Sequence, residues 1–304
     1  MRTDPQKVLQ AKKFALSRKL LINSETGSLK TVVLGIGHDQ GDELDINPVS
    51  KMHMENGTYP TEKAIVEEIQ TVEDALTKEG IEILRPANMP HREQIFTRDI
   101  GFVIEDKFVV ANMLEPVRQA EIRGIKWLLD EIGSLNIIRI PDNARVEGGD
   151  VIVHHDHVFV GISKRTNLAG FEFLKAQFPN KQFHAIALTV TDDPKTNVLH
   201  LDCTFQPVGK EMAIIYENGF KIKPTGIYDL FPEDKLIKVT QEEMNRMFPN
   251  IFSISQSKVL VERTFKRLIE ELNKKGIETI EVNYTETSKL SGLLRCSTLP
   301  LYRV

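Results

Sequence analysis

The sequence has few cysteines and no long apolar run. Its two cysteines, Cys203 and Cys296, are too few for a disulfide framework, so each is either a small buried side chain or a working thiol. No stretch of about 18 apolar residues occurs, and charged residues interrupt every apolar segment of the first 28 residues. We therefore expect neither a membrane span nor a signal-peptide core, and we expect the chain to stay in the cytoplasm.

The sequence also lacks a strong excess of either charge. It has 39 Lys and Arg residues against 43 Asp and Glu residues, which gives a net charge of -4 over 304 residues. This balance provides no general attraction to nucleic acid or to an anionic membrane, so we expect neither as a partner. A content of 41% hydrophobic and 27% charged residues is typical of a globular protein, and the length suits two domains or one large one.

Three segments resemble one another when they are aligned on an aspartate. Asp99, Asp150 and Asp202 lie 51 and 52 residues apart. Each aspartate precedes an apolar strand, a polar tip and a second apolar strand, which is the pattern of a β-hairpin. The hairpins at 97–113 and 148–163 are each followed by a helical stretch and a short β-rich run. The sequence therefore predicts a repeated unit of hairpin, helix and strand.

Weaker copies of this unit flank the three hairpins. The upstream copy comprises residues 29–86 and the downstream copy residues 250–283. Residues 224–248, in the unit that begins at Asp202, fit the pattern least well because turn residues are mixed with an acidic helix-like segment. About five units result, and repetition at this period indicates identical modules that share a core.

The two ends of the repeat array favour a closed ring over a linear solenoid. The last segment, 296–304, is a lone apolar strand, and the first strand also lacks a partner. We expect one α/β domain over residues 29–304, preceded by an N-terminal helical extension over residues 1–28. The three aligned aspartates would then occupy equivalent positions around one axis.

The second hairpin tip, residues 154–157, reads His-His-Asp-His and so suggests a metal site. The repeat places this tip where the first hairpin has Ile-Glu-Asp-Lys, which is a solvent-facing turn. Strand alternation leaves only His155 and His157 on one face. Two imidazoles fall short of the three protein ligands of a catalytic zinc site, so we predict a solvated tip, no metal and no cofactor.

Residues able to do chemistry gather at one edge of the repeat. Glu147 precedes two glycines that let the backbone approach a ligand closely. His200 and Asp202 are two positions apart, so in an extended strand they point to the same face as an acid/base pair. Cys296 lies between a glycine-containing loop and a strand-like end, whereas Cys203 faces away from His200. Taken singly, each also fits a plain structural role as a tight turn, a core histidine, a capping residue or a buried thiol.

With these residues the sequence resembles the guanidino-modifying enzymes of the pentein fold, namely arginine deiminases, dimethylarginine dimethylaminohydrolases and amidinotransferases. The matched pieces are Phe-Thr-Arg-Asp at 96–99, Glu-Gly-Gly-Asp-Val at 147–151, His-Leu-Asp at 200–202 and Arg-Cys-Ser-Thr-Leu-Pro-Leu at 295–301, in the order of the family. The resemblance covers residues 30 to 304. It implies a five-bladed ββαβ α/β-propeller, which agrees with the repeat count.

The resemblance also implies roles for individual residues. Cys296 is similar to the nucleophile and His200 to the general acid/base. Glu147 resembles the carboxylate that accompanies the histidine and holds substrate nitrogens. Asp99 and Asp202 resemble the pair of carboxylates that grips the guanidinium.

Two arginines complete the implied site. Arg118 and Arg165 resemble the arginines that bind the substrate carboxylate in arginine deiminases. A guanidinium is a planar cation with a fork of N–H donors, so carboxylates around its edge can hold it for attack on its carbon. The implied course is thiolate attack by Cys296, loss of ammonia or an amine protonated by His200, a covalent amidino intermediate, and hydrolysis to a ureido product such as citrulline.

The spacing bears on the choice within the family. Only 48 residues separate Asp99 from Glu147, so the large helical insertion of arginine deiminases is absent and the build resembles the dimethylarginine dimethylaminohydrolases. Asp202 provides a second carboxylate for the guanidinium, and in this respect the sequence resembles arginine deiminases and amidinotransferases. A second carboxylate favours a substrate whose terminal amidino group is unsubstituted. Amidinotransferases are longer and carry Asp at the position of Glu147, so we favour hydrolysis of arginine or a methylated arginine over amidino transfer.

Two alternatives belong to other classes. One is a non-catalytic binding protein of the pentein fold, which should lack the cysteine, histidine and carboxylate set. The other is a hydrolase that uses a metal bound at residues 154–157. Activity that persists in the presence of a chelator would exclude this alternative. The expected binding partner is a small guanidino molecule. The sequence is also compatible with a homodimer.

Overall fold

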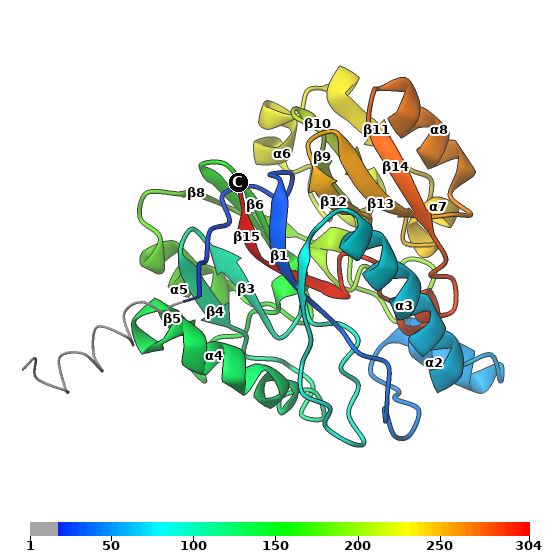
Figure 1. The fold of residues 1–304 in the computed structure, drawn as a ribbon. Helices are drawn as coiled ribbons and strands as arrows, with labels where there is room; N and C mark the ends of the chain where they lie inside the picture. The colour runs from blue at the N-terminus through cyan, green and yellow to red at the C-terminus, as the bar shows by residue number, and fades with distance from the viewer. Residues whose placement is uncertain (1–17) are drawn as a thin grey trace, which may run out of the picture.

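The computed structural model describes residues 18–304. Its strands form five three-stranded sheets, arranged around a common centre with the helices toward the outside (Figure 1). In each sheet the middle strand is antiparallel to one neighbour and parallel to the other. The predicted five-bladed ββαβ α/β-propeller is therefore confirmed.

The blades follow the order of the chain. Blade 1 consists of β15 (Thr298–Arg303), β1 (Leu29–Leu34) and β2 (Glu82–Leu84); blade 2 of β3 (Gly101–Ile104), β4 (Lys107–Val110) and β5 (Ile137–Arg139); blade 3 of β6 (Val151–His154), β7 (His157–Ile162) and β8 (Gln182–Ala187); blade 4 of β9 (Phe205–Val208), β10 (Met212–Ile215) and β11 (Leu236–Lys238); and blade 5 of β12 (Phe252–Ser255), β13 (Lys258–Glu262) and β14 (Glu278–Val282).

The helices lie between these strands along the chain. The α-helices are α2 (Pro48–Glu55), α3 (Glu62–Lys78), α4 (Lys126–Ile132), α5 (Leu168–Gln177), α6 (Thr225–Leu230), α7 (Gln241–Asn245) and α8 (Lys266–Lys274). In blade 4 the helix between β10 and β11 is α6, which has six residues, and the further short helix α7 follows β11. This short helix and the added one explain why the fourth unit fitted the repeat least well. No helix among residues 18–304 is long and apolar enough to cross a membrane.

The last strand closes the ring. β15 pairs antiparallel with β1, from Leu29 opposite Arg303 to Leu34 opposite Thr298. Figure 1 shows this C-terminal strand in red beside the N-terminal strand in blue. Because each strand supplies the hydrogen-bonding edge that the other lacks, blade 1 is assembled from both ends of the described chain.

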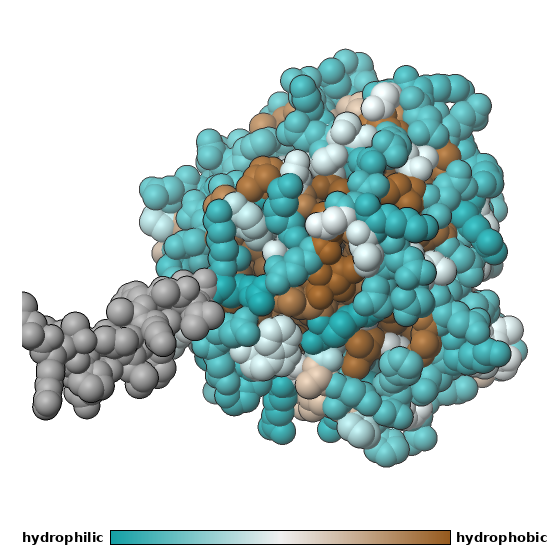
Figure 2. Space-filling view, viewed as in Figure 1, coloured by the Kyte–Doolittle hydropathy of each residue, from teal (hydrophilic) through white to brown (hydrophobic). Residues whose placement is uncertain are grey.

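Helix α3 shows how the sequence directs the outer layer. Thr61 accepts a hydrogen bond from the backbone N–H of Ala64 and so caps the helix start. Ile65, Ile69 and Val72 recur at helical spacing and are buried against the sheets. On the face shown in Figure 2, hydrophilic side chains cover most of the surface and apolar ones gather beside β1 and α3.

Residues 18–28 differ from the expected helical extension. They contain no helix, and instead Leu21, Ile22 and Ser24 form single β-bridges with three different blades. Burial of Ile22 and the open edges of the hairpins explain the extended conformation, because backbone groups there pair with neighbouring strands. The rest of the predicted extension, residues 1–17, lies outside the described residues.

Candidate active site

Every blade contributes a polar residue immediately before its first strand. These residues meet at one end of the propeller, and all are buried: Asp99 before β3, Glu147 and Asp150 before β6, His200 and Asp202 before β9, Asn250 before β12, and Cys296 before β15. The repeat therefore does bring the predicted aspartates to equivalent positions. It also brings in Asn250, which the sequence analysis missed although the downstream unit begins at this residue.

His200 lies between two carboxylates. Its Nε2 is 2.9 Å from Oε2 of Glu147, and its Nδ1 is 3.7 Å from Oδ1 of Asp99. Burial would lower the pKa of His200, but the charge of Asp99 and the hydrogen bond to Glu147 outweigh burial and raise this pKa to about 9. Burial would likewise raise the pKa of Glu147, but His200 and Arg165 bring it to about 2. At neutral pH the pair is therefore an imidazolium and a carboxylate.

The two glycines after Glu147 make room for this pair. A Cβ atom on Gly149 would lie 2.7 Å from Cγ and Nδ1 of His200. A Cβ atom on Gly148 would lie 2.0 Å from the backbone oxygen of Arg98. The Gly-Gly step thus permits the close approach that the sequence suggested, although its contacts are with the protein itself.

Asn250 holds the Cys296 thiol in place. Its Oδ1 accepts a hydrogen bond from the backbone N–H of Cys296 at 3.1 Å, and its Nδ2 lies 3.2 Å from the sulfur atom. Because the backbone N–H can only donate, the first bond fixes the amide so that its NH₂ group points at the sulfur. Burial, with the nearby charges of Asp202 and Asp99, raises the pKa of Cys296 well above its ordinary value.

Asp202 is close to the thiol but already has a cationic partner. Its Oδ2 is 3.6 Å from Sγ of Cys296 and 2.8 Å from Nη1 of Arg295. Arg295 is fully buried and also binds Glu25 at 2.9 Å. Neither Arg295 nor Glu25 was predicted as a site residue. Glu25 belongs to the N-terminal segment, and no sequence motif there indicates that it reaches this position.

Asp99 also has an arginine beside it. Nη1 of Arg118 donates to Oδ2 of Asp99 at 2.8 Å, while the other side of the guanidinium pairs with Glu121 at 2.9 and 3.0 Å. Oδ1 of Asp99 is buried and has no hydrogen-bond partner in the described part of the chain. The structure thus directs Arg118 toward Asp99, and it leaves one acceptor of Asp99 free within the site.

Arg165 and Glu93 line the same small cavity as His200 and Cys296. Nη2 of Arg165 donates to the backbone oxygen of Ile46 at 2.6 Å, whereas its buried Nε has no partner among residues 18–304. Burial, together with the charge of Asp99, raises the pKa of Glu93. Glu93 was also missed, because an isolated glutamate six positions before Asp99 has no motif of its own.

The cavity is closed by the chain. It has a volume of about 10 Å³, which is room for about one water molecule. Ile46 and Asn47 form part of its wall, and Nδ2 of Asn47 donates to the backbone oxygen of Leu290 at 3.3 Å. The cavity therefore has no room beside Cys296 for a molecule larger than water unless its wall moves.

The histidine-rich tip does not assemble a metal site in the described residues. His155 and Asp156 are exposed, while His154 is buried against Phe231. His157 lies 2.9 Å from His184, between ring nitrogens, and so pairs with a residue outside the tip. Within residues 18–304, the one group of three donors close enough to hold a metal comprises Asp99, Glu147 and His200 in the cavity described above.

Comparisons by sequence identify relatives over most of the chain. The family profile described as N,N dimethylarginine dimethylhydrolase, eukaryotic, matches residues 42–303. The uncharacterized protein YkgA of Bacillus subtilis is 32% identical over 286 residues, which are 94% of this chain and 96% of that protein. An N(G),N(G)-dimethylarginine dimethylaminohydrolase of Streptomyces coelicolor is 26% identical over 210 residues, which are 69% of this chain and 74% of that protein.

Solved structures share the fold. The N-terminal domain of ArgZ, an arginine dihydrolase from cyanobacteria, superimposes with a TM-score of 0.79 at 18% identity and covers 90% of this chain and 98% of its own. SxtG, an amidinotransferase from Microseira wollei, superimposes with a TM-score of 0.76 at 17% identity and covers 93% and 97%. At these identities the likeness establishes the shared propeller.

Proposed function

Because this chain belongs to the N,N-dimethylarginine dimethylhydrolase family, within the pentein superfamily of guanidino-modifying proteins, we propose that it hydrolyses a guanidino C–N bond with Cys296 as nucleophile. The substrate is arginine or a methylated arginine, and the product is a ureido compound such as citrulline plus ammonia or an amine. His200 is the general acid and base, and Glu147 holds it in its protonated form.

The observation that carries the proposal is the convergence of one thiol, one imidazolium and a free carboxylate oxygen in a single closed cavity. Oδ1 of Asp99 is buried and accepts no hydrogen bond in the described residues, with His200 Nδ1 3.7 Å away, so it can still accept an N–H from a ligand. A guanidinium supplies both the N–H donors and the positive charge. Asp99 and Asp202 then hold the guanidinium edge, with Asp202 shared between the substrate and Arg295.

The rest of the cavity suits the head group of an α-amino acid. The unpartnered Nε of Arg165 is a donor for a carboxylate. Glu93, which lines the same cavity, provides an acceptor for an ammonium group. Arg118 contributes indirectly, because its contact with Asp99 fixes the orientation of that carboxylate.

Substrate binding activates the thiol. Cys296 is protonated in the empty site because burial and the charges of Asp202 and Asp99 disfavour the thiolate. A guanidinium bound between those carboxylates neutralises them and places a positive charge near the sulfur, so the pKa of the thiol falls and its proton passes to solvent water.

The chemical steps then follow in order. The thiolate forms an S–C bond to the guanidino carbon, and the His200 imidazolium protonates the departing nitrogen as the C–N bond breaks. The neutral imidazole takes a proton from water, and the resulting hydroxide attacks the amidino carbon. The S–C bond breaks, which regenerates the thiolate, and the new hydroxyl group loses its proton to solvent to give the neutral ureido product. Glu147 stabilises the imidazolium each time it forms.

A direct assay tests this proposal. The pure protein is incubated with arginine, a methylated arginine, agmatine and guanidinoacetate, and both ureido product and released amine are measured. Citrulline from arginine or methylarginine, lost in Cys296→Ser and retained in Cys203→Ser, is the expected result. Agmatine should react poorly because it lacks the carboxylate for Arg165. Amidino transfer that appears only with an added amine acceptor would instead identify a transferase, and full activity of Cys296→Ser would refute the mechanism.

A further inference from the structure

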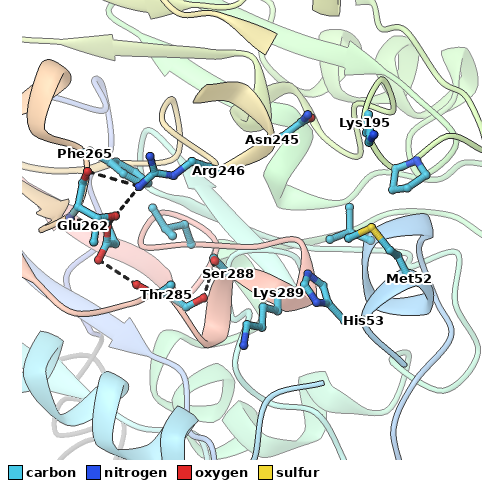
Figure 3. Close-up of a pocket in the computed structure, with 14 residues that line it drawn as sticks. Met52, His53, Lys195, Asn245, Arg246, Glu262, Phe265, Thr285, Ser288 and Lys289 are labelled. Carbon is cyan, nitrogen blue, oxygen red and sulfur yellow. Dashed lines mark hydrogen bonds between the residues drawn. The ribbon is translucent and has the colours of Figure 1, made fainter. Parts of the chain in front are cut away.

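A second cavity lies beside α2 (Figure 3). It shares wall segments with the active-site cavity. Its volume is about 320 Å³, which is within the lower range of small-molecule sites. Apolar side chains from α2 and from two loops, including Met52, Pro194 and Leu293, form much of its lining. It contains neither Cys296 nor His200, so the proposed reaction does not use it.

The charges around this cavity favour an anion. Lys195 and Arg246 line it, and neither has a carboxylate within ion-pair distance in the described part of the chain. Lys289 also lines it and is neutralised by Glu286 at 2.7 Å. Glu262 is the acidic residue of the lining, and it keeps its negative charge because its hydrogen bonds come from neutral threonines. Lys195 and Arg246 outweigh this single carboxylate, so the net charge of the lining is positive.

Arg246 is held ready to bind an oxyanion. Its guanidinium lies 5.4 Å from the ring of Phe248 and 5.5 Å from that of Phe265. One terminal nitrogen, Nη2, donates to the hydroxyl and backbone oxygens of Thr264. Stacking and these bonds fix the planar fork, which lowers the entropy lost when its remaining donors bind a carboxylate.

The two cavities share their walls. Three segments, 46–53, 194–200 and 288–296, each line the active-site cavity with some residues and the second cavity with others. In the last segment, Leu293 faces the second cavity while Cys296 faces the active site, and the backbone oxygen of Leu293 accepts two hydrogen bonds from Ser297. A ligand against Leu293 therefore contacts the loop that positions the nucleophile.

We propose that this second cavity is an effector site for a small aliphatic carboxylate, which binds through Arg246 and Lys195 and changes the reactivity of Cys296 through the shared wall. The apolar lining selects for the aliphatic part, and the fork of Arg246 selects for the carboxylate. The binding half of this proposal is independent of the proposed hydrolysis.

Binding is tested on the full chain with butyrate as the probe, by saturation-transfer NMR, with n-butylammonium as the cationic counterpart and inorganic phosphate as a second anion. We expect saturable binding of butyrate, weakened about tenfold in Arg246→Gln and in Lys195→Gln because a charge-assisted hydrogen bond is lost. Arg139→Gln, an exposed arginine on β5, is the matched control and should bind normally.

Coupling is tested by the rate of Cys296 alkylation with iodoacetamide in a Cys203→Ser background, which requires no turnover. Saturating butyrate should change this rate by about fivefold or more. Three results would overturn the assignment of the ligand. Butyrate could bind Arg246→Gln as tightly as the unmodified protein, n-butylammonium could bind as tightly as butyrate, or phosphate could bind while butyrate does not. Loss of binding in Arg165→Gln instead would place butyrate in the active site, and an unchanged alkylation rate would refute the coupling.

Discussion

Replacement of Asn250 tests how the site prepares its thiol. The Asn250 amide donates to the Cys296 sulfur at 3.2 Å, and its oxygen accepts from the Cys296 backbone N–H at 3.1 Å. A hydrogen bond to a charged group contributes about 1.5 to 3 kcal/mol. Since one pKa unit corresponds to about 1.4 kcal/mol, Asn250→Ala should raise the pKa of the thiol by about one to two units.

The two functions of the amide can be separated with a second variant. Asn250→Asp keeps an oxygen for the Cys296 backbone N–H but replaces the donor near the sulfur by a carboxylate oxygen. If the donor stabilises the thiolate, this variant should raise the pKa of Cys296 further than alanine does, because a negative charge then faces the sulfur. If Asn250 only positions the loop, Asn250→Asp should behave like the unmodified protein.

The assay is the rate of Cys296 alkylation by iodoacetamide, followed by intact mass in a Cys203→Ser background. Below the thiol pKa this rate is proportional to the thiolate fraction, so at pH 7 we expect about a 10- to 100-fold decrease for Asn250→Ala. Thermal unfolding of each variant checks that the fold is retained. Equal alkylation rates in all three proteins would refute the reasoning, and a slow Ala variant beside a normal Asp variant would reduce Asn250 to a positioning residue.

Three further predictions concern other parts of the site. Glu147→Gln removes the hydrogen bond and charge that help hold the pKa of His200 at about 9, so this pKa should fall toward 6.5 and the alkaline limb of the kcat/KM profile should move to lower pH. Gly149→Ala should decrease kcat by about 100-fold with little loss of folding, because its Cβ would displace the His200 ring; normal kcat would show that the ring tolerates the shift. Glu25→Gln should lower the free energy of unfolding by about 3 to 5 kcal/mol, measured in urea, because Arg295 loses a buried partner. The pKa of Glu25 falls to about 2 from 4.5 on folding, so its stabilisation is present above pH 4.5 and is lost as the pH falls to 2; the variant should lack this pH dependence.

The sequence by itself determined the architecture and the main residues to which we assign the chemistry. Aspartates at 99, 150 and 202 recur at nearly equal spacing, and each is followed by a hairpin that needs a neighbour to bury its apolar face. Local patterns of this kind predict the blades, the closure by residues 298–303 and the edge where the polar residues meet. Cys296 and His200 could be predicted because they stand at that edge within short, specific motifs.

Only the tertiary structure decided how the charges are partnered. Asp202 pairs with Arg295, and Arg295 with Glu25, which lies 270 positions away along the chain. Neither this cluster nor the contact of Asn250 with the Cys296 sulfur has a sequence pattern, because each joins different blades through single side chains. Likewise, residues 18–28 are extended because open hairpin edges lie beside them, which no local propensity encodes. A periodic hydrophobic pattern specifies each blade, because it depends only on residues close together in the sequence. The partner of a buried charge depends on which blades lie next to one another in the closed ring.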